Sequence, residues 1–545
     1  MRPIVSRLDA ATRGSILAGL FCALVASPLE CAERQRYGGT LRVELRAASV
    51  SLDPREWRVG STEFATDEKM GALVFDRLVV LDNYGRFQPE LTTEWSHDAA
   101  FKRWQFTLRT GVKFSDGAML TSADAVAALQ PLLPDGQQVS ASGNVVVIQS
   151  ATGAPDLLEE LASGRFFVYR VQPDGTLMGT GPFFVAEAAS GSRAPSSSST
   201  VAGESNLAGS VPGAAKLTHL RFRANEETWS GRPFLDAIEV TLGVPPLRQL
   251  LDLQLGKADL VEVSPELVRR AMQDNQRVWP SAPVTFYGLR FDDAQPAAAD
   301  AKLREAISLS LDRKTMANVL LQKQAEPASA LLPQWLSGYA FLFTMETNVD
   351  RAKEIRATLP ANTAAGTEPL RLRVDAQGDL AKLLAERVAV NARQAAILVQ
   401  VVNRPATRNA TTATNASSNS AAGGAHLFAW HYSSLSPRVE MESMVNTLKL
   451  GNSNAAIVSS TDPEQLYAYE KKLLEGRRVL PLVALPEYIG LSQKVRDWMP
   501  AQWGEWHLAD VWLDRSEPGA TQPADSNGAA VPATQPGAAP PGAKR

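Results

Sequence analysis

The stretch FTLRTGVKFSDG, residues 106–117, carries the strongest structural signal in the chain. Apolar residues alternate with polar ones over 104–108, which is typical of a half-buried strand. Residues 111–114, followed by Asp-Gly, predict a second strand that ends in a turn. Thr121 then precedes an alanine-rich run and predicts a helix N-cap, with Asp124 favourably placed in the first turn.

The same patterns continue on both sides of this stretch and alternate along the chain. Alternating apolar residues predict strands, and longer amphipathic runs predict helices. The expected strands are 40–45, 145–149, 217–223, 236–242, 371–375 and 397–402, and the expected helices are 246–255, 265–273, 300–311, 314–323, 379–395 and 462–475. The sequence therefore predicts a mixed α/β fold.

Composition limits the functional class. The chain has 545 residues, 45% of them hydrophobic and 21% charged, which fits several globular units rather than a small module or a multi-span membrane protein. Lys and Arg number 55 against 58 Asp and Glu. Without a basic excess, we expect no nucleic-acid partner.

The first 32 residues differ from the rest. Three arginines precede the apolar run 16–26, a pattern typical of a secretory signal peptide, so residues 1–32 are expected to be removed on export. Cys22 and Cys31, the two cysteines of the chain, both lie in this leader. The residues before them do not form a lipidation signal, so we expect no lipid anchor. The mature protein would then be periplasmic, without disulfides or a cysteine nucleophile.

Low-complexity segments interrupt the pattern. Residues 189–215 and 405–425 are rich in Ser, Ala, Asn and Thr and are expected to be a flexible insertion and a surface loop. Residues 518–545, rich in Pro, Ala and Gly, are expected to form a disordered tail.

Six further blocks occur in one order and together resemble the family 5 extracellular solute-binding proteins of bacterial ABC importers. The blocks lie before and after the 106–117 stretch, which is similar to the most characteristic segment of that family. They are Leu52-Asp53-Pro54, Phe75–Val79 with Pro89-Glu90-Leu91, Gly179–Phe183, Arg221–Asn225 with Trp229–Ile238, Leu255–Leu260 and Leu303–Arg313. We expect the glycines at 111, 117, 179 and 181 to serve turns, and the charges at 304, 305, 312 and 313 to be solvated.

The resemblance implies a bilobal fold like that of type II periplasmic binding proteins, in which two mixed α/β lobes close on a ligand at a hinge. The first lobe is expected at 37–265, with a subdomain at about 53–177, and the second at 266–479. Residues 480–515 would return to the first lobe. The protein would deliver its solute to an inner-membrane ABC permease, and we expect a monomer that is not an enzyme and holds no cofactor.

The resemblance points to peptides as the ligand. Peptide binders of the family hold the peptide backbone by strand-like hydrogen bonds and the terminal amine by an acidic residue of the second lobe. No Asp lies between Trp430 and Asn446, so Glu440 is the candidate amine anchor. Aromatic side chains supply contact area and arginines grip carboxylates. The remaining ligand-binding candidates are Trp57, Tyr287, Trp430, Tyr432, Arg290 and Arg438.

Other functions stay open at this point. The family also includes receptors for nickel, haem and sugars, and a protein of this fold can serve as a periplasmic sensor or chaperone. A secreted hydrolase is disfavoured, because neither a Gly-x-Ser-x-Gly elbow nor a His-Glu-x-x-His motif occurs. The five histidines are dispersed, so no metal site is expected.

Overall fold

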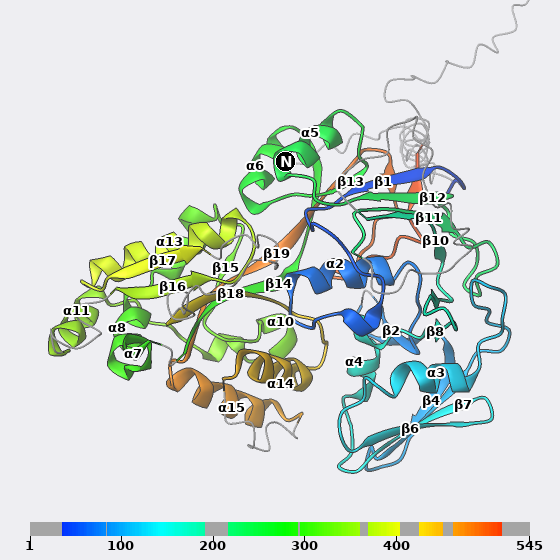
Figure 1. Ribbon diagram of the computed structural model, residues 1–545, viewed down its shortest axis with the longest axis horizontal. Coiled ribbons are helices and arrows are strands. Elements are labelled where there is room, and N and C mark those ends of the chain that lie inside the picture. Colours follow the sequence, from blue (N-terminus) through cyan, green and yellow to red (C-terminus); the bar gives the residue numbers. More distant parts are fainter. Residues whose placement is uncertain are drawn as a thin grey trace, which may run out of the picture.

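The computed structural model describes residues 35–82, 84–190, 216–292, 295–359, 369–403, 424–450 and 461–514. Strand β1 (Thr40–Glu44) lies in the middle of the first lobe, because its alternating Leu41 and Val43 are buried. It pairs in parallel with β12 (Ala237–Thr241) and β13 (Leu260–Glu262). Strands β11 (His219–Ala224) and β10 (Phe183–Ala189) extend the sheet antiparallel, while α5 (Pro246–Gln254) and α6 (Val268–Gln273) lie beside it (Figure 1).

A subdomain of the first lobe contains the 106–117 stretch. Its sheet has the order β4-β5-β7-β6, comprising β4 (Thr92–His97), β5 (Arg103–Leu108), β6 (Gln137–Ser142) and β7 (Val145–Ser150). Helix α3 (Ser122–Leu129) packs against it and begins with a capping box between Thr121 and Asp124, which confirms the predicted N-cap. Helix α4 (Leu157–Leu161) follows the sheet.

The predicted strand at 111–114 is wrong. Gly111 has a φ of +83°, which turns the chain out of the sheet directly after β5. Val112 and Phe114 are buried, but the segment forms only an isolated bridge between Lys113 and Met119. The apolar alternation therefore reports burial of this loop and not a strand.

The second lobe has its own core around strands β16 (Leu370–Val374), β17 (Val399–Asn403) and β18 (Ala425–His431), which pair in parallel. Five longer helices belong to this lobe: α8 (Ala301–Ser310), α11 (Val349–Thr358), α13 (Asp379–Gln394), α14 (Pro437–Leu448) and α15 (Pro463–Glu475). The helix predicted at 314–323 is shorter than expected. It consists of α9 (Arg313–Thr315) and a π-helical turn, Met316–Leu320, and ends where Gln322 and Lys323 take positive φ angles.

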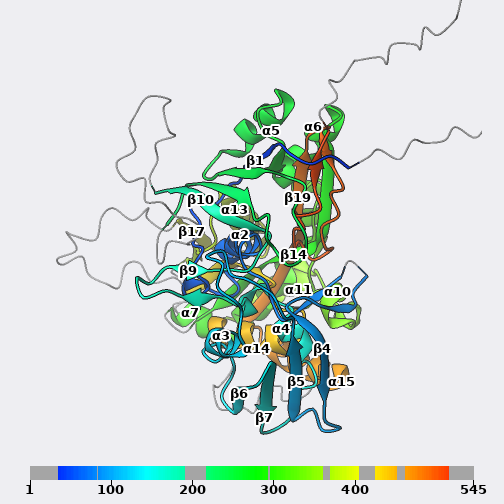
Figure 2. The same ribbon diagram turned by 90° about the vertical axis from the view of Figure 1, so that its right-hand side faces the viewer.

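Two long strands carry the chain between the lobes. Strand β14 (Arg277–Phe291) pairs antiparallel with β19 (Val479–Leu491), and the two lie side by side in both views (Figures 1 and 2). Their ladder changes register near Pro280 and Pro283, and Pro283 lies opposite Pro486. Proline donates no backbone hydrogen bond, so the pairing is weakest where the chain passes from one lobe to the other. This interruption is the natural place for a hinge.

The remaining elements are short. They are η1 (Pro54–Glu56), α2 (Thr62–Gly71), β2 (Val79–Leu81), β3 (Phe87–Pro89), η2 (Gly164–Phe166), β8 (Arg170–Val171), β9 (Leu177–Met178), η3 (Pro265–Leu267), α7 (Pro296–Ala299), β15 (Glu326–Pro327), α10 (Gln334–Ser337), η5 (Ala340–Leu342), β20 (Val495–Arg496) and β21 (Trp512–Leu513). The last two pair with each other after the chain has returned to the first lobe.

Several sequence blocks meet in space around Asp76. Its carboxylate accepts hydrogen bonds of 2.8 Å from Thr180 Oγ1 and from Trp229 Nε1. Gly179 and Gly181 adjoin this site without positive φ angles; a Cβ at either position would overlap the backbone of Val74. The predicted turn role therefore holds for Gly111 and Gly117, whereas these two glycines serve close backbone approach.

The arginines at 304 and 313 are buried, contrary to the expectation of solvated charges. Arg304 donates to the carbonyl oxygens of Ala298 and Ala299, and Arg313 Nε donates to Pro481 O at 2.6 Å. Both guanidinium groups stay buried because backbone carbonyls accept their hydrogen bonds.

Some predictions fall on residues outside the described ranges. These are the signal peptide at 1–32, nearly all of the segments 189–215 and 405–425, and the tail at 518–545. The predicted lobe boundaries stay predictions. In the part of the chain that the structure describes, no helix has the length and apolar character needed to cross a membrane.

Candidate functional site

A small cavity of about 30 Å³ lies where the two lobes meet. The first lobe contributes residues of α2, of the segment after α4 and of the loop before β21, and the second lobe contributes the segment after β18 with one residue of α10. The lining residues are Glu68, Lys69, Ala72, Ala162, Ser163, Trp503, Gly504, Glu505, Trp335, His431, Tyr432, Ser433, Ser434 and Leu435. About 10–15 Å³ holds one water, so the cavity suits a guest group of one or two heavy atoms.

Helix α2 brings charged side chains to this interface. Ser61 caps the helix by accepting a hydrogen bond from the backbone N–H of Phe64. Lys69 is 6% exposed, and its Nζ lies 2.5 Å from Oε2 of Glu487 on β19. Glu487 lies next to Pro486, so this ion pair ties the helix of the first lobe to the strand at the hinge.

Glu68 lies beside Lys69 but has a different environment. Its Oε1 accepts a hydrogen bond of 2.9 Å from the backbone N–H of Gly164. Among the described residues it makes no ion pair, because Lys69 is engaged by Glu487 and Arg77 is engaged by Glu505 and Glu90. Burial, reinforced by the nearby charge of Glu505, raises the pKa of Glu68 to about 7.

His431 ends strand β18 and faces the same cavity. It is 4% exposed, and burial lowers its pKa to about 4, so the imidazole is neutral at physiological pH. Its backbone N–H donates to Gly60 O at 3.1 Å, a direct hydrogen bond between the lobes. Within the described ranges its ring forms no hydrogen bond, which is rare for a buried polar group.

Glu440 and Trp430, two of the predicted ligand residues, bond to each other. Trp430 Nε1 donates to Glu440 Oε1 at 2.5 Å, and the backbone N–H groups of Ser433 and Ser434 donate to Oε2. Both side chains are buried, at 2% and 0% exposure, and burial raises the pKa of Glu440 to about 7. The carboxylate therefore shapes the segment that lines the cavity, and its role as an amine anchor stays a prediction.

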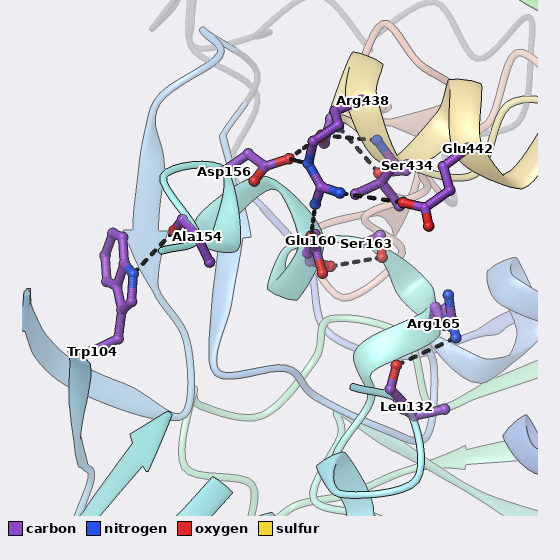
Figure 3. Close-up of polar contacts among 12 residues, drawn as sticks. Trp104, Leu132, Ala154, Asp156, Glu160, Ser163, Arg165, Ser434, Arg438 and Glu442 are labelled. Carbon is purple, nitrogen blue, oxygen red and sulfur yellow. Dashed lines mark hydrogen bonds and ion pairs between the residues drawn. The ribbon is translucent and has the colours of Figure 1, made fainter. Parts of the chain in front are cut away.

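Arg438 joins the lobes through carboxylates. Its Nε lies 2.8 Å from Oδ2 of Asp156, and its Nη2 contacts Glu160 of α4, as Figure 3 shows. Ser436 Oγ also donates to Asp156, at 2.5 Å, and Glu442 lies within the same helix as Arg438, 3.3 Å from Nη1. The predicted role of Arg438 toward a ligand carboxylate stays a prediction, and the structure gives this guanidinium three protein carboxylates instead.

The other predicted residues are distributed over the interface and the core. Tyr432 lines the cavity and donates to Leu331 O at 2.5 Å. Trp57 lines a separate, more open groove of about 470 Å³ between the first lobe and α14. Tyr287 is buried in the core of the second lobe, and Arg290 lies near the end of β14, opposite His426. The structure thus groups Trp430, Tyr432, Arg438 and Glu440 and leaves Tyr287 and Arg290 apart from the cavity.

Several cavity residues were not singled out from the sequence, notably Glu68, Lys69, Ser433 and Glu505. One available signal was the pair of adjacent charges, Glu68-Lys69, inside an otherwise apolar stretch of α2. His431 was treated as an ordinary histidine because its partners lie in the other lobe. Within the described ranges, no three His, Cys, Asp or Glu side chains are arranged to hold a metal ion.

Comparison with known proteins places this geometry in a family. The sequence model of the bacterial extracellular solute-binding proteins, family 5, matches residues 86–194 and 210–451. The chain belongs to this family. The resemblance seen in the sequence blocks is thereby confirmed.

Individual relatives are distant in sequence. The nickel-binding protein NikA of Staphylococcus aureus is 21% identical over 402 residues, covering 71% of this chain and 74% of that protein. Two solved structures each have a TM-score of 0.67 and confirm the bilobal α/β fold. NikA from Brucella suis with Fe(III)-EDTA is 19% identical, covering 87% of this chain and all of that one, and DppA from Helicobacter pylori with the peptide STSA is 14% identical, covering 88% and 99%.

Proposed function

We propose that this protein is the substrate-binding component of an ABC importer, which captures a small solute between its lobes and delivers it to an inner-membrane permease. Membership of the solute-binding family supports the proposal. The observation that carries it is the cavity lined from both lobes, together with the two strands that join them. A ligand between two such lobes shifts an open–closed equilibrium by contacting both.

Peptides are the proposed solute class. Among the similar proteins, DppA binds the peptide STSA, while NikA of Brucella suis holds Fe(III)-EDTA. Trp57, Tyr432 and the backbone near His431 offer aromatic area and hydrogen-bonding groups on both sides of the interface. We place the mature protein in the periplasm, as a monomer that binds without catalysis.

Native mass spectrometry of the gently purified protein, compared with denaturing conditions, tests this function. Masses that are lost on denaturation identify a co-purified solute. A thermal-shift screen of short peptides, sugars, haem and nickel follows. A ligand at 100 times its Kd stabilises the folded protein by about 2.7 kcal/mol, which raises Tm measurably. No bound mass and no shift with any class would contradict the proposal.

A further inference from the structure

The cavity between the lobes has more negative than positive groups around it. Glu487 and Glu505 are each already paired, with Lys69 and Arg77. Glu68 is the carboxylate left over, and it lines the cavity. An unpaired carboxylate in a partly desolvated place favours a cationic partner.

The backbone is shaped to admit this carboxylate. A Cβ at Gly164 would overlap Oε1 and Cγ of Glu68, so the absence of a side chain there lets the carboxylate approach the backbone. The Gly164 N–H then holds one oxygen at 2.9 Å. Glu68 is thereby fixed in orientation by a single hydrogen bond that leaves acceptor capacity on the carboxylate.

A second, independent observation comes from the other lobe. His431 lines the same cavity, is 4% exposed, and has no hydrogen bond to its ring within the described part of the chain. A neutral imidazole carries one acceptor nitrogen. A buried polar ring without a partner points to a guest that supplies a donor.

We infer that this cavity receives an ammonium group of the transported solute, with Glu68 as counter-ion and the ring of His431 as hydrogen-bond acceptor. The inference rests on the proposed solute-binding function and narrows its substrate class to amine-bearing solutes. An ammonium is compact and carries three donors, which suits a cavity of about 30 Å³ with acceptors on both walls. Because Glu68 and His431 belong to different lobes, the same contacts favour lobe closure.

Calorimetry with matched probes tests the inference. The probes are trialanine, N-acetyltrialanine, putrescine and nickel chloride. Wild-type protein is expected to bind trialanine at least about 10-fold more tightly than its acetylated form. Glu68→Gln removes the charge at nearly constant volume and is expected to weaken binding of the free amine about 10- to 100-fold, as loss of a charge-assisted hydrogen bond does. Binding of the acetylated probe should be unchanged.

Two variants make the result specific. Glu68→Asp keeps the charge and should recover part of the preference for the free amine. Glu94→Gln changes an exposed carboxylate of β4 in the same lobe and should bind all probes like wild type. A variant that merely misfolds would lose both peptides equally, so the ratio between them reports the ammonium contact.

The outcomes separate the inference from the proposed function. Tight binding of trialanine alone identifies a peptide terminus, and binding of putrescine as well identifies an alkylammonium; both support the inference. Equal affinity for free and acetylated peptide, no change in Glu68→Gln, or binding of nickel chloride alone overturns it while the binding function stands. Failure of wild type to bind any probe, or any solute of the wider thermal-shift panel, overturns both.

Discussion

Nε of Arg438 lies 2.8 Å from Oδ2 of Asp156, and this contact joins helix α14 of the second lobe to the residue that precedes α4 in the first. Glu160 contacts the same guanidinium, and Ser436 donates to the same aspartate (Figure 3). Asp156 and Glu160 are 6% and 3% exposed. These contacts exist only when the lobes are together, so they favour the closed arrangement.

Replacing Arg438 by methionine is expected to shift the protein toward an open form. The side chain keeps much of its volume, but Asp156 and Glu160 lose their cation and gain free energy by returning to water when the lobes separate. Small-angle X-ray scattering of the unliganded protein should show a larger radius of gyration than wild type. Arg351→Met, at an exposed position of α11, is the control. Identical scattering from Arg438→Met and wild type would contradict a latch.

The buried pair between Lys69 and Glu487 makes a prediction about stability. Lys69→Met leaves Glu487 as an uncompensated charge beside the hinge and is expected to lower the free energy of unfolding by about 3–5 kcal/mol. The double variant Lys69→Met/Glu487→Gln should recover most of the loss. Urea denaturation of the four proteins measures the coupling. Additive losses would mean that the two side chains do not stabilise each other.

Local sequence signals were enough for much of the fold and too little for the cavity. Thr121 and Asp124 meet within one helical turn, so their capping box could be predicted from spacing alone. Gly111 broke a predicted strand because apolar alternation does not encode a positive φ. Arg313 looked solvated because its acceptor, Pro481 O, lies on a strand far along the chain.

The same limit explains the candidate site. Trp430, Tyr432 and Glu440 were found because they lie in one recognisable segment. Glu68 and His431 come from different lobes, and nothing in either local sequence indicates the other. Only the folded chain shows that they line one cavity.

Glu440 predicts that stability declines at alkaline pH. Its pKa is raised to about 7, chiefly by burial, so the folded protein binds this proton more tightly than the unfolded chain does. The contribution is therefore complete at low pH and is lost as the pH rises through 7, by about 1.4 kcal/mol for each unit above that value. Burial also raises the pKa of Glu160 and Glu470 to about 7, which acts in the same direction.

Urea denaturation between pH 6.5 and 8.5 checks this prediction. The window lies above the range in which His431 titrates, since the pKa of that group is lowered to about 4. Glu440→Gln carries no titrating proton, so its unfolding free energy should fall less steeply with pH than that of wild type. The variant is also expected to be less stable at every pH, because an amide cannot accept all the hydrogen bonds made by Trp430, Ser433 and Ser434. Equal slopes would assign the pH dependence to other groups.

Gly60 predicts a way to block closure without disturbing either core. It lies before α2 with a φ of +79°, and a Cβ there would overlap the indole ring of Trp430 from the other lobe. Gly60→Val is therefore expected to keep the lobes apart, enlarging the unliganded protein in scattering and weakening solute binding by at least about 10-fold, because closed-lobe contacts are lost. Gly85→Ala is the matched control: its φ is +75° with no atom near the added Cβ, so it carries the backbone strain without the clash. If both variants scatter and bind alike, contact between Gly60 and Trp430 does not limit closure.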